Sequence, residues 1–235
     1  MDLSSLPEEG RSHWKTSFSV EGLFLEEKIA HALDEVLLQN PVLVDHFPCV
    51  EVVVLDRPHV TMPKQFMYQD QAILIASKYL RLRSGDTFSA DLSGNNTALC
   101  YTVPTSTLYM LKEYYNNISV THISSLVWQY LSKSTDNTES SICFFGLIHN
   151  TLLVISQEKG KLCFSKTFNL TDDADLMYYA VSCSRMLKSQ QHSFFTIENE
   201  EMQFEFPMDS LIKIDNNISL PSLHKLLSQY KACEL

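Results

Sequence analysis

The chain has 235 residues, with 18 Lys and Arg against 28 Asp and Glu, which gives a formal net charge of -10. This charge argues against a nucleic-acid binder, because affinity for a phosphate backbone comes largely from Lys and Arg. It also argues against anionic membrane surfaces. Hydrophobic residues make up 45% of the sequence, too many for an intrinsically disordered chain. We therefore expect a folded protein that binds neither nucleic acid nor membrane, and whose partner is another protein.

Glycine is scarce, and this bears on nucleotide binding. Only six glycines occur, and no G-x-G-x-x-G or G-x-x-x-x-G-K-[ST] motif is present. Loops that cradle phosphates need several glycines close together, because their backbone must turn tightly and present its N–H groups. We therefore do not expect a P-loop or Rossmann enzyme. The six cysteines form no C-x-x-C pair, so we expect buried reduced thiols and no metal site.

The N-terminus predicts the compartment. The first eleven residues carry Asp2, Glu8 and Glu9 and no apolar run, which differs from a secretory signal, and no stretch reaches the length of a membrane span. We expect a cytoplasmic protein.

The first half of the chain reads as a mixture of helices and strands. Apolar residues at helical spacing predict helices over 25–39, 69–82 and 106–115, and Ser124 or Ser125 is expected to cap a short helix that ends near 132. Alternating or valine-rich runs predict strands over 14–20, 49–55, 59–62, 87–92, 97–103 and 118–122. A Ser-Gly-Asn-Asn turn at 93–96 joins two of them into a hairpin.

The second half has a clearer order. Three β runs, over 142–148, 152–157 and 161–168, predict a meander, and a helix follows from Thr171 to about Lys188. A strand over 193–198, a connection through 202–206 and a polar stretch, a strand over 211–214 and a closing helix over 221–230 complete the pattern. This order is that of a ribonuclease H-like unit, a mixed sheet covered by helices. The polar segment 133–140 marks the boundary, which divides the chain into domains 1–133 and 140–235.

A family resemblance supports this division. The run ICFFGLIHNTLLVISQEKGKLCFSKTFNLTDDADLMYYAV, with PKQF at Pro63–Phe66 and the closing helix, resembles the bacterial family called domain of unknown function 3822. The resemblance implies an α/β fold with mixed sheets: an actin-like ATPase fold, in which two ribonuclease H-like domains face each other across a cleft.

The resemblance also identifies a site to inspect. Active members of the superfamily carry D-x-G in the first hairpin of each domain, where the aspartate positions Mg²⁺ or water and the glycine holds phosphate. Here the second hairpin reads Phe144-Phe145-Gly146. The residues before Leu25 contain no D-x-G and are too few for the usual pair of strands, so we expect a first domain truncated at its N-terminus. No catalytic residue is assigned, and ATP with Mg²⁺ is left as an open alternative to the absence of any cofactor.

Other polar residues have structural explanations that compete with functional ones. Gly146, His149, Asn150 and Thr151 are the candidate nucleotide contacts, although a two-residue turn selects Asn for positive φ in any case. Asp172, Asp173 and Asp175 fit a helix N-terminus better than a cation site. His59 and His122, in apolar strands, fit satisfied structural histidines. Tyr178-Tyr179 and Phe194-Phe195 are expected to pack in the core, with an outward member as a candidate partner contact.

Three hypotheses follow. The first is a non-enzymatic actin-like protein that acts as a protein-binding or scaffolding module. The second is a nucleotide-binding switch without efficient hydrolysis, which predicts ATP or ADP binding that a bulky residue at Gly146 weakens. The third is an active ATPase, kinase or phosphatase, which needs an unconventional carboxylate in the cleft, such as Asp172.

Overall fold

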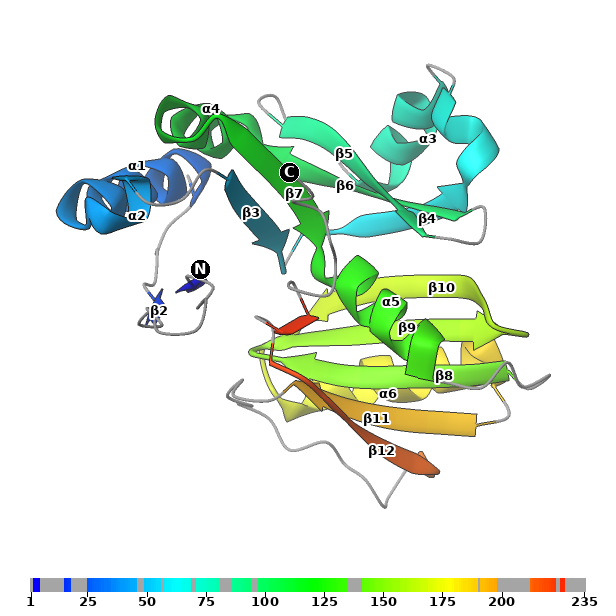
Figure 1. The fold of residues 1–235 in the computed structure, drawn as a ribbon. Helices are drawn as coiled ribbons and strands as arrows, with labels where there is room; N and C mark the ends of the chain where they lie inside the picture. Colours follow the sequence, from blue (N-terminus) through cyan, green and yellow to red (C-terminus); the bar gives the residue numbers. More distant parts are fainter. Residues whose placement is uncertain are drawn as a thin grey trace.

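The computed structural model describes residues 2–4, 15–17, 25–45, 49–55, 57–68, 71–80, 86–93, 97–134, 141–189, 191–197, 212–222 and 225–226. These residues form two halves, and helix α5 (Ile123–Ser134) leads from the first half into the second (Figure 1). None of the helices in this part of the chain is long and apolar enough to cross a membrane.

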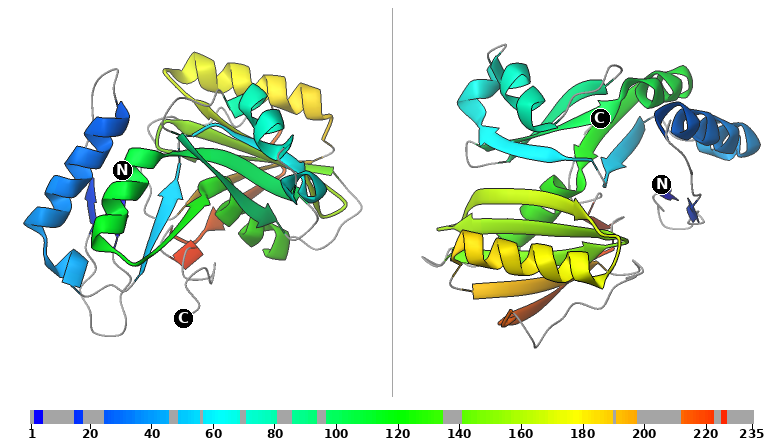
Figure 2. Two further views of the ribbon diagram at one scale, coloured as in Figure 1. Left: turned by 90° about the horizontal axis from the view of Figure 1, so that it is seen from above. Right: turned by 180° about the vertical axis from the view of Figure 1, so that it is seen from behind.

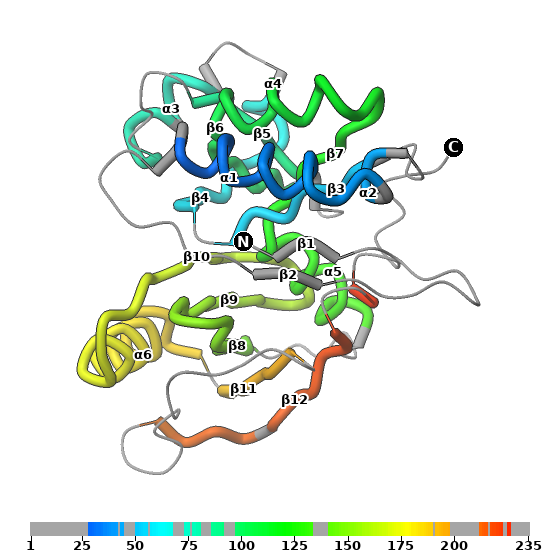
Figure 3. Tube along the Cα trace, turned by 90° about the vertical axis from the view of Figure 1, so that its left-hand side faces the viewer, coloured from blue at the N-terminus to red at the C-terminus, as the bar shows by residue number. Residues whose placement is uncertain are grey.

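The second half is built on one five-stranded sheet. Strands β8 (Ser141–Ile148), β9 (Thr151–Glu158) and β10 (Lys161–Asn169) pair antiparallel, which confirms the predicted meander. Strands β11 (Gln191–Ile197) and β12 (Asn216–Leu220) are parallel to β8, and the order across the sheet is β10-β9-β8-β11-β12. Figure 3 shows these strands in this order, with β10 nearest the first half and β12 farthest from it.

Helices cover both faces of this sheet. Helix α6 (Asp173–Leu187) lies over one face, as the rear view in Figure 2 shows, and packs against Cys143, Phe145 and Leu147 of β8. Helix α5 packs over the other face, against Phe144 and Ile148. Successive residues of a strand point to opposite faces, so the continuously apolar β8 is buried on both sides, as the central strand of a covered sheet must be.

The first half contains a smaller parallel pair. Strand β3 (Cys49–Val54) pairs with β7 (Asn117–His122) in parallel register. Val50, Val52 and Ile118 pack against α1 (Leu25–Gln39) and α4 (Thr105–Tyr114), whereas Val53 packs against the core of the second half. The pair therefore lies between two helices and the second half of the molecule.

Helix α1 ends where the sequence predicts. Pro41 cannot continue the helix, and the side chain of Asn40 donates a 2.8 Å hydrogen bond to the carbonyl oxygen of Val36. A short helix, α2 (Val42–Asp45), follows and was not predicted.

A second sheet is inserted between β3 and β7. Strands β4 (His59–Pro63), β5 (Asp86–Ser93) and β6 (Thr97–Pro104) are antiparallel in the order β4-β6-β5, and the predicted β5–β6 pairing is confirmed. Helix α3 (Gln71–Leu80) and the 3-10 helix η1 (Lys64–Tyr68) pack on this sheet. Of the predicted turn at 93–96, Ser93 ends β5 and residues 94–96 lie outside the described residues.

The N-terminus contains a short strand pair. Strand β1 (Asp2–Ser4) pairs antiparallel with β2 (Lys15–Ser17). A pair of strands, each of three residues, is thus present before Leu25, contrary to the expectation that these residues are too few for one. Among the described residues these strands pair only with each other and do not join β3.

Some predicted elements differ from the observed ones. The predicted strand over 211–214 is wrong, because the strand beside β11 is β12 at Asn216–Leu220. Asp215 fixes this register: its side chain accepts from the backbone N–H of His192, and its own N–H donates to the His192 carbonyl oxygen. The segment 202–206 and most of the predicted closing helix lie outside the described residues, as do 135–140 of the polar boundary segment.

Candidate functional site

Phe144, which the resemblance matches to the D-x-G aspartate of the superfamily, is an aromatic side chain in the core. Phe144 is 0% exposed and belongs to the cluster that α5 forms with the sheet through Leu126, Val127 and Leu131. A carboxylate could not replace this ring without a large desolvation cost. The second half therefore uses this strand position for packing.

Gly146 is also explained by packing. It lies opposite Leu153 on β9 and Phe195 on β11. A Cβ atom at Gly146 would overlap the ring of Phe195, which is fully buried. The glycine accommodates an aromatic ring, a role that sequence reasoning missed because it depends on a cross-strand neighbour.

The three remaining predicted nucleotide contacts lie together at the β8–β9 turn. The positive φ of the turn is at His149 (52°), and not at Asn150 as the sequence analysis assumed. The carbonyl oxygen of Asn150 accepts from the backbone N–H of Leu170 at 2.8 Å. The buried hydroxyl of Thr151 donates to Asn169 at 3.4 Å. These bonds tie the turn to the end of β10.

The acidic cluster at 172–175 caps a helix. Asp172 is the N-cap of α6, and its side chain accepts from the backbone N–H of Asp175 at 2.9 Å. Asp175 in turn accepts from the backbone N–H of Thr171. These bonds satisfy N–H groups that have no partner within the helix. The carboxylate of Asp172 is engaged in capping, so the observed contacts give no support to the third hypothesis.

A buried polar junction lies where the two halves meet, and its centre is Asp91 on β5. Asp91 is 6% exposed and accepts three hydrogen bonds: from the Tyr101 hydroxyl (2.8 Å), the Thr121 hydroxyl (3.0 Å) and the backbone N–H of His122 (2.8 Å). The hydroxyl of Tyr101 also lies 2.9 Å from the carbonyl oxygen of Val120. A buried carboxylate needs such donors to offset its desolvation. Asp91 thereby joins β5, β6 and β7.

His122 extends the junction from β7 into α5. Its Nε2 lies 3.0 Å from the carbonyl oxygen of Arg57, and its Nδ1 accepts from the backbone N–H of Ser124 at 3.1 Å. A carbonyl oxygen can only accept, so the ring is neutral and carries its proton on Nε2. Burial lowers the pKa of His122 to about 4. The predicted structural role of His122 is confirmed, and its ring performs the capping that the sequence analysis gave to Ser124 or Ser125.

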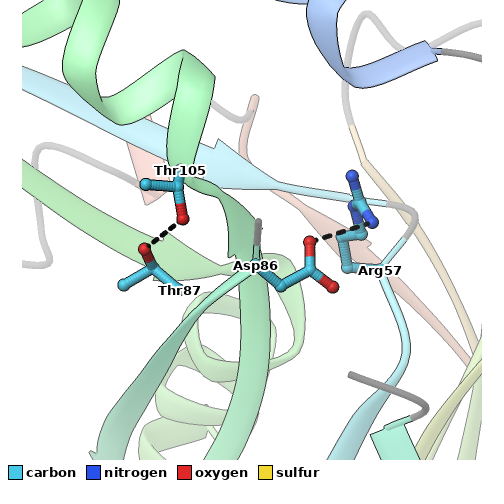
Figure 4. Close-up of polar contacts among 4 residues, drawn as sticks. All are labelled: Arg57, Asp86, Thr87 and Thr105. Atoms are coloured by element: carbon cyan, nitrogen blue, oxygen red, sulfur yellow. Dashed lines mark hydrogen bonds and ion pairs between the residues drawn. The ribbon is translucent and has the colours of Figure 1, made fainter. Parts of the chain in front are cut away.

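Arg57 connects the junction to two sheets. Figure 4 shows its contact with Asp86 and, beside it, the contact between Thr87 and Thr105. Its guanidinium lies 3.9 Å from a carboxylate oxygen of Asp86 at the start of β5. Its carbonyl oxygen accepts from His122 and, at 3.4 Å, from the hydroxyl of Thr167 on β10. Beside it, the hydroxyls of Thr87 and Thr105 are 2.7 Å apart and join β5 to α4.

His59 adds a second bond between the halves. Its Nε2 and the hydroxyl of Ser165 on β10 are 2.8 Å apart, and its ring centroid lies 4.4 Å from that of His122. Its Nδ1 is buried without a hydrogen-bond partner. Burial, and then the neighbouring His122, hold the pKa of His59 well below its ordinary value. His59 is buried, as predicted, and one of its two ring nitrogens has a hydrogen-bond partner. The predicted structural role of a satisfied histidine is therefore confirmed in part.

Glu51 is a half-buried carboxyl that the sequence analysis missed. It lies on β3, on the face that includes Val53, opposite Ser119 on β7. Burial raises its pKa to about 7, and the nearby Asp91 adds to the effect. Glu51 Oε1 and Ser119 Oγ are both buried without a hydrogen-bond partner. A lone Glu inside the valine run CVEVVV was the available signal, because a charged residue there breaks the apolar pattern.

Neither a metal centre nor a reactive thiol is present in the described part of the chain. No group of three or more His, Cys, Asp or Glu residues there could hold a metal ion. Cys100, Cys143 and Cys183 are free and buried, as predicted, and Cys163 is free but exposed. Burial raises the pKa of the Cys183 thiol to about 11, so it remains protonated near neutral pH.

Comparison with known families identifies the chain. It matches the family described as "Protein of unknown function (DUF3822)" over residues 7–197. The chain belongs to the DUF3822 family. A search of curated proteins found no match.

Solved structures show the fold of this DUF3822 protein. A protein from Bacteroides thetaiotaomicron VPI-5482, described as having an actin-like ATPase fold and unknown function, aligns with a TM-score of 0.71 at 15% identity, over 83% of this chain and 77% of that one. The PilM–PilN type IV pilus biogenesis complex aligns with a TM-score of 0.52 at 9% identity, again over 83% and 77%. These likenesses support the expected actin-like fold and, at such identities, nothing beyond it.

The packing of Gly146 under Phe195 predicts a specific coupling. Gly146→Ala should lower the free energy of unfolding by about 2 kcal/mol, because an added methyl overpacks the core. In a Phe195→Leu background the same substitution should cost at least about 1 kcal/mol less. Urea unfolding of the four proteins measures this difference. Phe194→Leu, on the opposite face of β11, is the control background, and an equal cost of Gly146→Ala in all backgrounds would contradict the assignment.

The neutral His122 ring predicts an acid-sensitive stability. Because its folded pKa lies below the usual value of about 6.5, the unfolded state binds the proton first, and stability falls as pH drops from about 6.5 towards 4. The expected slope is about 1.4 kcal/mol per pH unit for one such group. His59 acts in the same direction. Glu51 acts oppositely, since its raised pKa makes the folded state bind its proton first.

The test therefore measures how one substitution changes the slope of unfolding free energy against pH. His122→Gln should flatten the dependence of unfolding free energy on pH between 6.5 and 4.5, relative to wild type. His31→Gln, at an exposed side chain on α1, should leave the slope unchanged. An unaltered slope in His122→Gln would contradict a buried neutral ring.

Proposed function

We propose that this protein is a non-catalytic member of the actin-like superfamily that acts as a protein-binding or scaffolding module. The observation that carries the proposal is the fully buried Phe144 at the D-x-G position. Phosphoryl transfer depends on metal-mediated neutralisation of charge and on a positioned nucleophile. A phenyl ring supplies neither, and it occupies the space that a carboxylate would need.

The rest of the hairpin supports the same proposal. Gly146 accommodates Phe195, and the carbonyl of Asn150 and the hydroxyl of Thr151 are bonded to the segment at 169–170. The Thr151 hydroxyl, a donor that could face a phosphate in the nucleotide-binding alternative, is thus engaged within the protein. That alternative would require the turn to exchange these bonds for contacts with a nucleotide.

Two observations favour protein partners. The solved PilM–PilN complex is an assembly of two proteins, and one of the chains in it resembles this one in fold. Several large apolar side chains are also exposed on helices here, among them Leu74 and Tyr79 on α3, Tyr109 on α4 and Tyr178 on α6. Of the aromatic pairs considered in the sequence, Tyr178 is the outward member, whereas Tyr179 stacks on Phe168.

Thermal unfolding with and without millimolar ATP or ADP and Mg²⁺ tests the proposal. A nucleotide at about 100 times its dissociation constant would stabilise the protein by about 2.7 kcal/mol, a shift of about 5 to 10 °C for a chain of this size. We expect no shift and no release of phosphate. A shift without turnover would favour the nucleotide-binding switch, and turnover by the purified protein would overturn the proposal.

Placing the aspartate of the superfamily motif at position 144 should destabilise the protein and should not produce an ATPase. Phe144→Asp should lower the free energy of unfolding by at least about 4 kcal/mol, because it removes a buried ring and buries a charge. It should confer no ATP hydrolysis. Phe144→Leu should cost only about 1 kcal/mol, since it preserves apolar volume. A stable Phe144→Asp protein that hydrolyses ATP would contradict the account of this strand.

A further inference from the structure

The outer face of helix α6 carries one small residue with four large neighbours. Residues three and four positions apart are neighbours on a helix surface, and for Ser182 these are Tyr178, Tyr179, Arg185 and Met186. Tyr178 is 67% exposed and Met186 is 60% exposed, and Ser182 and Arg185 are also exposed. The rear view in Figure 2 shows α6 lying along the outside of the second-half sheet. Large side chains are therefore exposed around a small one on this helix.

The aromatic part of this face is supported by the sheet. Tyr179 stacks on Phe168 of β10 with ring centroids 4.4 Å apart, and the ammonium of Lys166 lies 5.1 Å from the Phe168 ring. The rings of Tyr178 and Tyr179 form a T-shaped pair with centroids 5.4 Å apart. Side chains that are already positioned lose less freedom when a partner binds. Tyr178 is thus suited to anchor a partner, as tyrosines often do at interfaces.

The pattern on this face is self-complementary. Tyr178 and Tyr179 precede Ser182 at the spacing at which Arg185 and Met186 follow it. If two copies of α6 cross antiparallel at this serine, the tyrosine pair of each copy lies against the Arg-Met pair of the other.

The chemistry of these pairs is favourable. A guanidinium over a tyrosine ring makes a cation–π contact, and a thioether beside a ring is also attractive. A parallel crossing would instead place Arg185 against its own copy. A twofold interface requires a surface that complements itself, and the antiparallel crossing provides one.

Charge favours the same direction and limits the strength. Helix α6 has Asp173 and Asp175 in its first turn and Arg185 in its last turn, and antiparallel helices bring opposite ends together. Each copy carries a net charge of -10, which opposes association. One face of a helix of 15 residues buries less than the roughly 800 Å² per partner of a standard interface. We therefore expect a weak dimer, with a dissociation constant on the order of 10 μM or above.

We propose that the outer face of α6 is a self-association surface, on which two copies of this chain form a dimer through antiparallel α6 helices that cross at Ser182. The proposal rests on the proposed protein-binding function and names one partner for it, a second copy of the chain.

A cysteine at the crossing point tests this geometry. In Ser182→Cys, oxidised glutathione should produce a disulfide-linked dimer, because tight packing at a small residue brings the two Cα atoms near the roughly 4.4–6.8 Å that a disulfide spans. Ala174→Cys is the control, since Ala174 is exposed and lies eight residues earlier on the same helix. Antiparallel copies keep two residues at this position about 24 Å apart. Mass spectrometry of the linked peptides separates this bridge from any that native cysteines form.

Sedimentation equilibrium measures the association without a cross-link. At about 0.15 M salt, where repulsion between charges more than about 8 Å apart is screened, the wild-type chain should dimerise reversibly. Tyr178→Ala should weaken the dimer at least about tenfold, because it removes an anchor from the centre of the interface. Tyr109→Ala removes a similarly exposed tyrosine from α4 and should leave the dissociation constant unchanged.

Four results would each overturn the self-association surface. These are a wild-type chain that stays monomeric at about 200 μM, equal weakening by the two tyrosine substitutions, a linked dimer of Ala174→Cys, and a thiol in Ser182→Cys that a maleimide cannot reach. The last would mean that the chain itself covers this face. None of them touches the absence of catalysis, whereas ATP turnover would overturn the proposed function and leave the dimer standing.

Discussion

The arrangement of the two halves depends on one neutral imidazole. The Nε2 of His122 donates to the carbonyl oxygen of Arg57, and its Nδ1 accepts from the backbone N–H of Ser124. The backbone N–H of His122 donates to the carboxylate of Asp91. The ring stands at the residue where β7 ends and α5 begins. Because the bonded groups come from the β3–β4 connection, from α5 and from β5, the inserted sheet and the connecting helix are fixed relative to each other.

This junction explains why the second half lies where it does. Arg57, held by His122, also accepts from Thr167 on β10, and His59 contacts Ser165 on the same strand. The edge strands β4 and β10 of two different sheets thus meet through side chains. These contacts join residues of the first half to β10 of the second.

Much of the fold could be predicted from sequence. The meander, α1 and the β5–β6 pairing follow from local periodicity and turn residues, which act over a few positions. The strand over 211–214 could not be distinguished from Asn216–Leu220, because Asp215 and its contacts with His192 decide the register and lie far apart in sequence. The cap of α5 was predicted wrongly for a similar reason. Serine is a usual N-cap residue, but here the ring of His122 accepts from the backbone N–H of Ser124.

The candidate site could be predicted only in part. Phe144 and Gly146 were found through the family motif, but the partner that explains Gly146, Phe195, is on another strand. Asp91 was missed because no local pattern marks it, and its role depends on the donors that tertiary contacts bring to it. Glu51 interrupts a valine run, but the run does not show which groups lie beside its carboxyl. Glu51 and Asp91 lie in the half of the chain where the family motif gives no guidance.

The most direct test of this account is the tautomer and charge of His122, measured by nitrogen-15 NMR of the imidazole ring. We predict a neutral ring with its proton on Nε2 at pH 7 that stays neutral at pH 5.5. A proton on Nδ1, or a ring that is charged at pH 5.5, would contradict the bonds to Arg57 and Ser124 and, with them, the described junction between the halves.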